Sequence, residues 1–191
     1  RDGNEELINS LLPTVTSIPA ITAVCRCLVA ERVPIRSFSL ILQAISDFHL
    51  ALQDGSAGGT NWAGQAEGRG AGRSRLGSTV AYVRNALKRE ITRLLLQNGE
   101  AVLWRLASQA DDLLSAVART GAPLDPLIVR SIIDAAASAG AAGPPAVLVS
   151  GQCRSLLGQL FAGARLKISV VAAEEIEAGV PLRIAGEIDP L

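Results

Sequence analysis

The stretch Leu28-Val29-Ala30-Glu31-Arg32-Val33-Pro34-Ile35-Arg36 decides how this chain is organised, together with the residues that follow it. The ring of Pro34 disfavours a helical backbone at Val33, so a first helix has to stop there. Ser37 can then cap a second helix by accepting a backbone N–H from its first turn. Beyond it, apolar residues recur at spacings of three and four and form one stripe: Phe38, Ile41, Leu42, Ile45 and Phe48. The stretch predicts two amphipathic helices joined by a rigid turn.

Composition limits the classes of partner. The chain has 191 residues, enough for one domain or two small ones, and 49% of them are apolar, enough for a hydrophobic core. Its 18 basic and 18 acidic residues cancel, and aromatic residues make up only 3%. A neutral chain with few aromatic side chains lacks both the field and the stacking surface that nucleic acid needs. We therefore expect no nucleic-acid partner.

Targeting and redox signals are weak. Cys25, Cys27 and Cys153 do not form a disulfide framework, and no apolar run is long enough to cross a membrane. The polar residues 1–6 do not resemble a signal peptide, so cytosolic exposure is the default expectation. The chain contains no methionine and begins at Arg1, which is typical of a piece of a longer protein.

The N-terminal half has a helical pattern. Helices are predicted at residues 4–12, from Ser17 to a stop at Val33-Pro34, from Phe38 to about Leu52, and from about Ser78 to a stop at Asn98-Gly99. Between them, residues 53–77 are rich in glycine and polar residues and predict a flexible insert. Residues 1–98 are therefore expected to form a helical subdomain.

Residues 99–191 alternate between strand and helix patterns, as in a small α/β subdomain. Short strands are predicted at 101–106, 146–149, 166–171 and 182–188, with a central place for the wholly apolar 146–149. Helices are predicted at 123–139 and 152–161, and a single turn at 174–177. The predicted fold class is α+β, a helical subdomain followed by a three- to four-stranded sheet with helices.

Three blocks of sequence carry a resemblance to a known family: LVAERVPIRSFSLILQAI at 28–45, LGSTVAYVRNALKREI at 76–91 and AVLVSGQCRSLLGQL at 146–160, with SVVAAEEI at 169–176 as a fourth, weaker one. In this order they resemble the cytoplasmic region of the FHIPEP proteins, the flagellum/hypersensitive response/invasion protein export pores of bacterial type III secretion. Ser37 stands where that family usually has Asp, and Gly151 where it has proline. The resemblance would place residues 1–98 in the third cytoplasmic subdomain and 99–191 in the fourth.

The resemblance implies a binding module without catalytic, metal or cofactor residues. It implies a place at the cytoplasmic face of the inner membrane, with membrane contact only through a preceding part of a multi-pass parent. Implied partners are secretion chaperones, export substrates, other export-apparatus proteins including the ATPase complex, and neighbouring copies in a ring. The subdomains absent from this sequence carry much of the ring surface, so the chain alone is expected to associate weakly. Residues expected to face partners are Arg32, Pro34, Arg36, Arg84 and Arg154.

Other chemistry finds little support in the residues. Cys25 and Cys27 point to different sides of a helix, and His49 lies near an apolar stripe, so structural roles are favoured over a metal site. Gly68, Gly70 and Gly72 lack the strand and the Gly-Lys-Ser/Thr ending of a phosphate loop. The adjacent carboxylates Asp111-Asp112 and Glu174-Glu175 are expected to be solvated.

Two alternatives remain open. Ser150-Gly151 lies between a strand and a helix, as in a nucleophile elbow, although Leu148 stands where such an elbow has glycine. A small enzyme or ligand-binding domain with a site near Ser150 is the main alternative, and a helix N-cap is the simpler role for this serine. The other alternative is a helix-turn-helix DNA binder at residues 17–52, which the charge balance disfavours.

Overall fold

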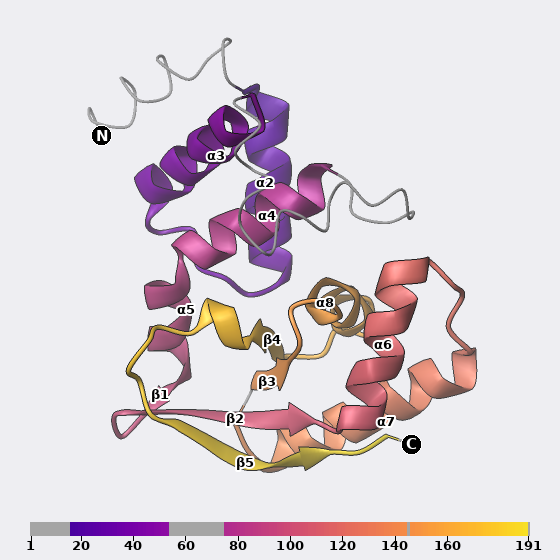
Figure 1. Cartoon of the computed structure of the whole chain (residues 1–191). Helices are drawn as coiled ribbons and strands as arrows, with labels where there is room; N and C mark the ends of the chain where they lie inside the picture. Colours follow the sequence, from indigo (N-terminus) through magenta and orange to yellow (C-terminus); the bar gives the residue numbers. More distant parts are fainter. Residues whose placement is uncertain (1–15, 54–74, 145, 191) are drawn as a thin grey trace. The chain divides into compact units, whose positions relative to one another are not determined.

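The computed structural model describes residues 16–53, 75–144 and 146–190, which divide into two compact units (Figure 1). Unit 1 comprises the described residues up to Leu87, and unit 2 begins at Lys88. The expected helix at 4–12, the three glycines at 68–72 and most of the glycine-rich insert lie outside the described residues. The end of that insert, Arg75–Gly77, belongs to a helix.

Unit 1 begins with the two helices that the sequence predicts. Helix α2 spans Ile18–Ala30 and helix α3 spans Phe38–Gln53. The side chain of Ser17 caps α2 by accepting the backbone N–H of Ala20 at 3.4 Å, and the helix has its proline in the first turn. The predicted helical pair is confirmed.

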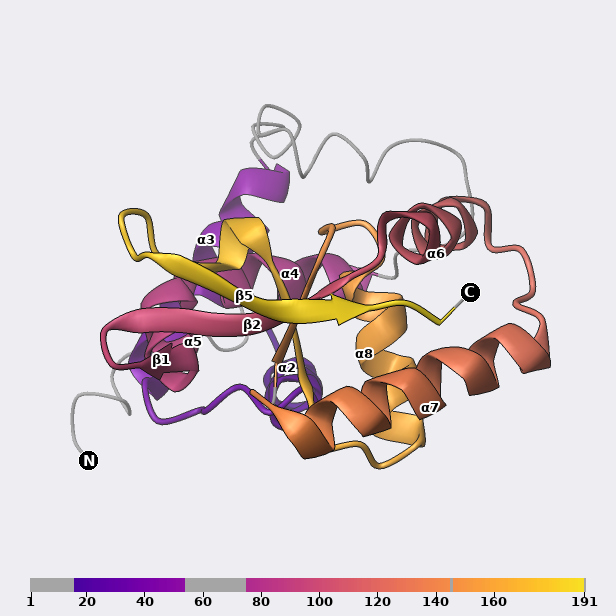
Figure 2. The same ribbon diagram turned by 90° about the horizontal axis from the view of Figure 1, so that it is seen from below.

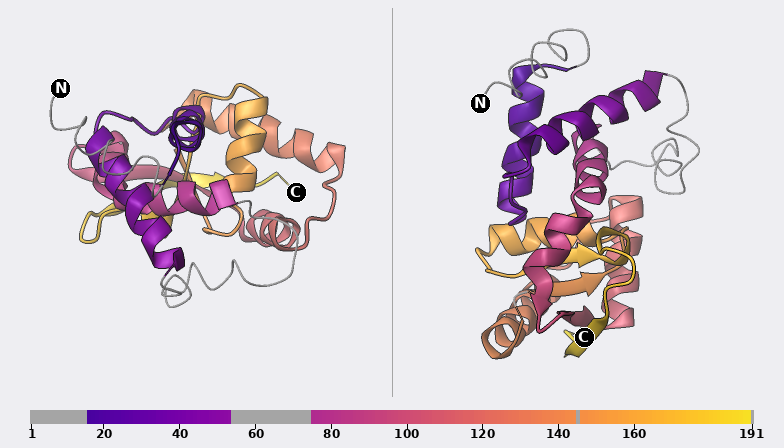
Figure 3. Two further views of the ribbon diagram at one scale, coloured as in Figure 1. Left: turned by 90° about the horizontal axis from the view of Figure 1, so that it is seen from above. Right: turned by 90° about the vertical axis from the view of Figure 1, so that its left-hand side faces the viewer.

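Helix α4, Arg75–Ala86, packs against both α2 and α3, and Figure 3 shows that these three helices cross one another. Their facing stripes form the core of unit 1, whose buried apolar members are Ile21, Val24, Leu28, Val33, Ile41, Leu42, Ala44, Ile45, Phe48, Val80, Val83 and Leu87. Burial of these spaced residues supplies the stability that short isolated helices lack.

The prediction of a single helix from Ser78 to Asn98 is wrong. Helix α4 ends at Ala86, α5 spans Lys88–Leu95, and β1, Leu96–Gln97, follows at once. Asn98 and Gly99 have φ of 54° and 87°, and β1 pairs antiparallel with β2, Glu100–Leu106. Two consecutive left-handed residues of the type Asn-Gly form a two-residue hairpin turn. Asn98 and Gly99 therefore connect two strands, whereas the sequence predicts that they end a helix.

The rest of unit 2 follows the predicted alternation, with one addition. After β2 come α6 (Ser108–Thr120), α7 (Pro126–Ala142), β3 (Ala146–Val149), α8 (Arg154–Gly163), β4 (Ser169–Ala172), the 3₁₀ turn η2 (Ala173–Glu175) and β5 (Leu182–Ile188). Helix α6 was not predicted. The other elements are confirmed with ends shifted by a few residues, which is the ordinary uncertainty of boundaries.

The sheet of unit 2 is mixed. Strand β2 lies next to β1 and β3 on one side and next to β5 on the other, and Figure 2 shows β5 running beside β2. Strand β4 extends the sheet beyond β3 (Figure 1). All pairs except β1–β2 are parallel. Strand β3 is flanked on both sides, as its apolar sequence predicts.

One hydrophobic core holds the sheet of unit 2 to its helices. Residues of α6, α7 and α8 join strand residues in it: Leu106, Ala110, Leu114, Ile132, Ala136, Val147, Val149, Cys153, Leu157, Phe161, Ile168, Val170 and Ile188. The predicted α+β class is confirmed. None of the helices in the described ranges has the length and apolar character that a bilayer crossing requires.

Candidate protein-docking site

The connection between α2 and α3 is a rigid turn built by backbone hydrogen bonds. The Val33 N–H donates to the Leu28 carbonyl at 2.8 Å, and the Arg32 N–H donates to the Val29 carbonyl at 3.0 Å. Arg32 itself has a φ of 63°. This pattern is a Schellman motif, in which a left-handed residue ends the helix. The chain therefore leaves α2 at Arg32, before the proline, and Val33 packs back into the core beside Leu28.

A buried ion pair fixes this turn to α4. The Arg84 guanidinium lies 3.0 Å from the Glu31 carboxylate, with side chains that are 1% and 13% exposed. Glu31 is the C-cap residue of α2, immediately before Arg32. Because a buried pair holds one geometry, the ion pair sets the direction in which the turn projects.

The turn presents two basic side chains. Arg32 and Arg36 are exposed, Pro34 is half-buried between them, and Ile35 is an exposed apolar residue of the same turn. The Schellman motif and the proline restrict this backbone, so little conformational entropy is lost when a partner binds. A guanidinium recognises a carboxylate through paired hydrogen bonds, which suits an acidic partner surface.

Arg84 and Arg154 do not belong to an exposed surface of their units. Arg84 is buried as described, and the Arg154 guanidinium lies 3.1 Å from the Glu175 carboxylate with both side chains 5% exposed. Both residues were expected to face partners, but both guanidinium groups are buried in ion pairs within their own units. Spacing carried a signal that was overlooked: Arg84 follows Val80 by four, and Arg154 precedes Leu157 by three, so each lies within an apolar stripe.

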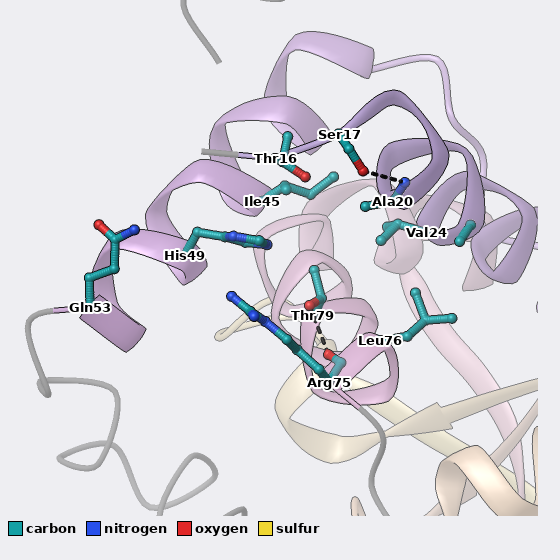
Figure 4. Close-up of a pocket in the computed structure, with 11 residues that line it drawn as sticks. Thr16, Ser17, Ala20, Val24, Ile45, His49, Gln53, Arg75, Leu76 and Thr79 are labelled. Carbon is teal, nitrogen blue, oxygen red and sulfur yellow. Dashed lines mark hydrogen bonds between the residues drawn. The ribbon is translucent and has the colours of Figure 1, made fainter. Parts of the chain in front are cut away.

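A hollow of about 430 Å³ lies elsewhere in unit 1, between α2, α3 and α4 (Figure 4). His49 and Arg75 reach into the same space, and Gln53 lies at its rim. Thr16 also lines it, and its buried hydroxyl has no hydrogen-bond partner within the described part of the chain. No cysteine and no carboxylate appears among the residues that line this hollow. The described residues that line the hollow therefore supply no acid–base pair and no set of metal ligands.

Ser150 belongs to a small polar cluster in unit 2. Its hydroxyl lies 2.8 Å from the Ser115 hydroxyl and 3.5 Å from the Cys153 sulfur, and its backbone N–H donates to Asp111 at 2.8 Å. The Cys153 thiol donates to the same carboxylate at 3.2 Å. These bonds tie α6 to the connection between β3 and α8. Their geometry gives Ser150 a structural role, but the expected N-cap role is wrong, because the N-cap residue of α8 is Cys153.

The thiols are held protonated. Burial raises the pKa of Cys153 to about 12, and burial also raises the pKa of Cys25. The pKa of Cys27 is raised by burial and, to a lesser extent, by the charge of Glu31. A thiol is a nucleophile or a metal ligand only as thiolate, so none of the three is activated.

The paired carboxylates are not both solvated, contrary to expectation. Asp111 is half-buried and accepts bonds from Ser150 and Cys153, whereas Asp112 is exposed. Glu175 is buried against Arg154, whereas Glu174 is exposed. Within residues 16–53, 75–144 and 146–190, no three His, Cys, Asp or Glu side chains converge as a metal site would require.

The comparison with known families decides the identity. The sequence profile of the FHIPEP family matches residues 1–181. The chain belongs to the FHIPEP family. No curated protein sequence matches it significantly.

Solved structures share the fold of this FHIPEP chain. The Shigella flexneri MxiA protein superimposes with a TM-score of 0.72 at 20% identity, over 96% of this chain and 55% of MxiA. The Chlamydia pneumoniae CdsV protein gives 0.70 at 19% identity, over 96% and 50%. The nonameric EPEC SctV-C gives 0.68 at 18% identity, over 97% and 52%. The FHIPEP chain therefore spans about half the length of these structures.

Proposed function

We propose that this chain is a docking and assembly portion of a bacterial type III secretion export gate, and that it works by binding and performs no chemistry. Membership of the FHIPEP family supports the general role. The rigid turn with exposed Arg32 and Arg36 is the observation that supports a docking role for this part of the chain.

The proposed partners are secretion chaperones, export substrates, other export-apparatus proteins including the ATPase complex, and neighbouring copies in a ring. Two similar structures support parts of this set: the EscV cytosolic domain is nonameric, and CdsV has been solved in complex with CdsO. The full-length parent would lie in the inner membrane and expose this portion to the cytoplasm.

The proposed mechanism is multivalent binding. An exposed pair of arginines contributes about 1 kcal/mol or less for each ion pair, which is too little for tight binding by one copy. A ring repeats the same turn several times, and linked sites raise the overall affinity 10²- to 10⁴-fold without a new contact. Each single contact dissociates quickly, so the cargo is retained only while several sites are occupied together.

The test reverses the charge of the turn in the full-length protein within its own bacterium. Arg32→Glu combined with Arg36→Glu should reduce secretion of type III substrates at least tenfold without lowering the amount of the protein. Arg26→Glu is the matched control, because Arg26 is an exposed arginine on α2 outside the turn. Normal secretion by the double variant, or an equal loss with Arg26→Glu, would overturn the proposal.

The enzymatic alternative near Ser150 is not favoured by the structure. The recorded partners of its hydroxyl are Ser115 and Cys153, and neither of these is a base at neutral pH, because the pKa of Cys153 is raised to about 12. Ser150→Ala separates the two functions: a lost turnover would support an enzyme. Unchanged partner binding with no turnover in either form would support the docking module.

The DNA-binding alternative is disfavoured by the second helix of the pair. Helix α3 contains no arginine and no lysine, and Asp47 lies on its exposed side. A recognition helix needs basic side chains toward the phosphates.

A further inference from the structure

Strand β5 forms an edge of the sheet in unit 2. It pairs with β2 over Leu182–Ile188, and within the described residues no other strand pairs with it (Figure 1). A free edge of this length presents a row of unpaired backbone donors and acceptors, which can accept another strand.

The backbone groups that face outward can be assigned. The Pro181 carbonyl accepts the Ala101 N–H at 2.8 Å, and the Ile188 carbonyl accepts the Ala107 N–H at 2.9 Å, so both of these residues face β2. Backbone groups alternate between the two edges of a strand. The neighbours Leu182 and Glu187 therefore direct their N–H and C=O groups away from β2, as does Ile184, two residues after Leu182.

An apolar strip crosses one face of the sheet and reaches this edge at one end. Leu96 and Leu182 are both register partners of Ala101, so they lie on the same face of the sheet. They are 41% and 47% exposed. Ile184 lies on that face too and is half-buried. At the other end of the strand, Glu187 is exposed on the same face, opposite its register partner Arg105.

Charged side chains often protect an edge strand from pairing, but the charged residue at this end of the strand, Arg183, lies on the face opposite Leu182. Arg183 points away from the Leu182 face, and its guanidinium lies 3.3 Å from the Glu100 carboxylate. A register shift between Leu103 and Trp104 adds a bulge, which separates Ile184 from Glu187 by one extra residue. The apolar end of the edge, at Leu182 and Ile184, is thus left open.

We propose that β5 binds an extended segment of a partner protein by strand addition. The segment would place apolar side chains beside Leu182 and Ile184 and a basic side chain beside Glu187. Main-chain hydrogen bonds would supply affinity that depends little on sequence, and the strip would supply the preference. This site lies in unit 2 and is independent of the arginine turn proposed above.

A second copy of β5 fits the edge poorly. Antiparallel pairing of two β5 strands through their outward-facing residues, centred on Ile184, would set the Glu187 carboxylate of one copy opposite Leu182 of the other. Parallel pairing would need a two-fold axis along the strands, which turns one copy over and puts the two Leu182 side chains on opposite faces of the sheet. Neither arrangement gives Leu182 the apolar cross-strand partner that would stabilise the pairing. The proposal therefore specifies a different protein as occupant.

The test uses seven-residue synthetic peptides in which two valines and one lysine alternate with threonines, made in both sequence directions. Titration of the full chain, followed by amide NMR and hydrogen exchange, should show protection at Leu182, Ile184 and Glu187 and a dissociation constant below a few millimolar. The same peptides methylated on every backbone nitrogen should not bind, because they cannot donate to the edge.

Variants separate the edge from the fold. Glu187→Pro removes an outward N–H without touching the ladder to β2 and should weaken binding at least tenfold. Glu187→Gln keeps the N–H and should change affinity by less than about fivefold. Leu182→Lys replaces an exposed side chain, preserves the fold and should weaken binding, because a charge would replace the apolar contact with a peptide valine.

Four outcomes would overturn the proposal. These are no binding up to several millimolar, equal binding of the methylated peptides, equal affinities for Glu187→Pro and Glu187→Gln, and protection of β5 by raised protein concentration without peptide. The last outcome would assign the edge to a second copy. None of them alters the secretion phenotype expected for the arginine turn, so the two proposals fail separately.

Discussion

The ion pair between Arg84 and Glu31 is predicted to hold unit 1 together, and Arg84→Met tests it. The substitution keeps much of the buried volume and removes the charge of Arg84, whose side chain is 1% exposed. Glu31, whose side chain is 13% exposed, then loses this partner. Breaking a buried pair costs about 3–5 kcal/mol. Because Glu31 retains some contact with water, we expect the lower end, about 3 kcal/mol.

Coupling between the two residues distinguishes an ion pair from simple packing. Arg84→Met combined with Glu31→Leu removes both charges and should cost only about 1 kcal/mol, because apolar replacement of a whole buried pair is often nearly neutral. The double-mutant cycle should therefore give a coupling energy of about 2 kcal/mol or more.

The assay has to follow each unit separately, because two compact units need not unfold together. Hydrogen exchange of the α2, α3 and α4 amides in the full chain should accelerate roughly 150-fold for a loss of about 3 kcal/mol, while β2 and β3 amides stay unchanged. Arg154→Met is the reciprocal variant and should loosen unit 2 alone. Unaltered exchange in unit 1, or a double variant as unstable as Arg84→Met, would refute the reasoning.

Further predictions concern backbone strain, packing and a thiol. Arg32→Gly should stabilise unit 1 by up to about 1 kcal/mol and Arg32→Val should destabilise it by about 1–2 kcal/mol in urea unfolding, since φ is 63° there. Gly186→Ala should cost about 2 kcal/mol or more in thermal unfolding, because a Cβ at this position would collide with the Trp104 ring. The folded-state pKa of Cys153 is raised from 9.0 to about 12, so the unfolded chain loses this proton first and stability should fall as the pH rises from 9 towards 12. Cys153→Ala should lose less stability over that range, and in the folded protein Cys153 should resist alkylation at pH 8.

Local signals predicted the helical pair correctly. Ser17 and the proline after it mark the start of α2, and the spacing of Ile41, Leu42 and Ile45 marks the buried side of α3. Such features act within one or two turns, so they can be found without knowledge of the rest of the fold. The position of the turn was less accurate: Pro34 was expected to stop the first helix, whereas the left-handed Arg32 ends it earlier.

Signals with two meanings were resolved only by pairing with another element. Asn98-Gly99 suits a helix C-cap and a hairpin turn equally well, and the antiparallel pairing of β1 with β2 selects the hairpin. The predicted helix ended at residue 139, yet α7 continues through Gly140 to Ala142, and the missing Cβ of Gly140 leaves room for the side chain of Ile168. In both cases the energy that decides comes from residues distant in sequence.

By itself, the sequence determined the α+β class, the α2–α3 pair, a sheet centred on residues 146–149 and the resemblance to the FHIPEP family. Only the tertiary structure decided which charged side chains face solvent. Arg84 meets Glu31 across 53 positions, whereas Arg32, next to that same glutamate, stays exposed. The spacing of apolar residues predicts which face of a helix is buried. A charged residue on that face is stable only where a partner distant in sequence offsets its desolvation, and only folding brings that partner close.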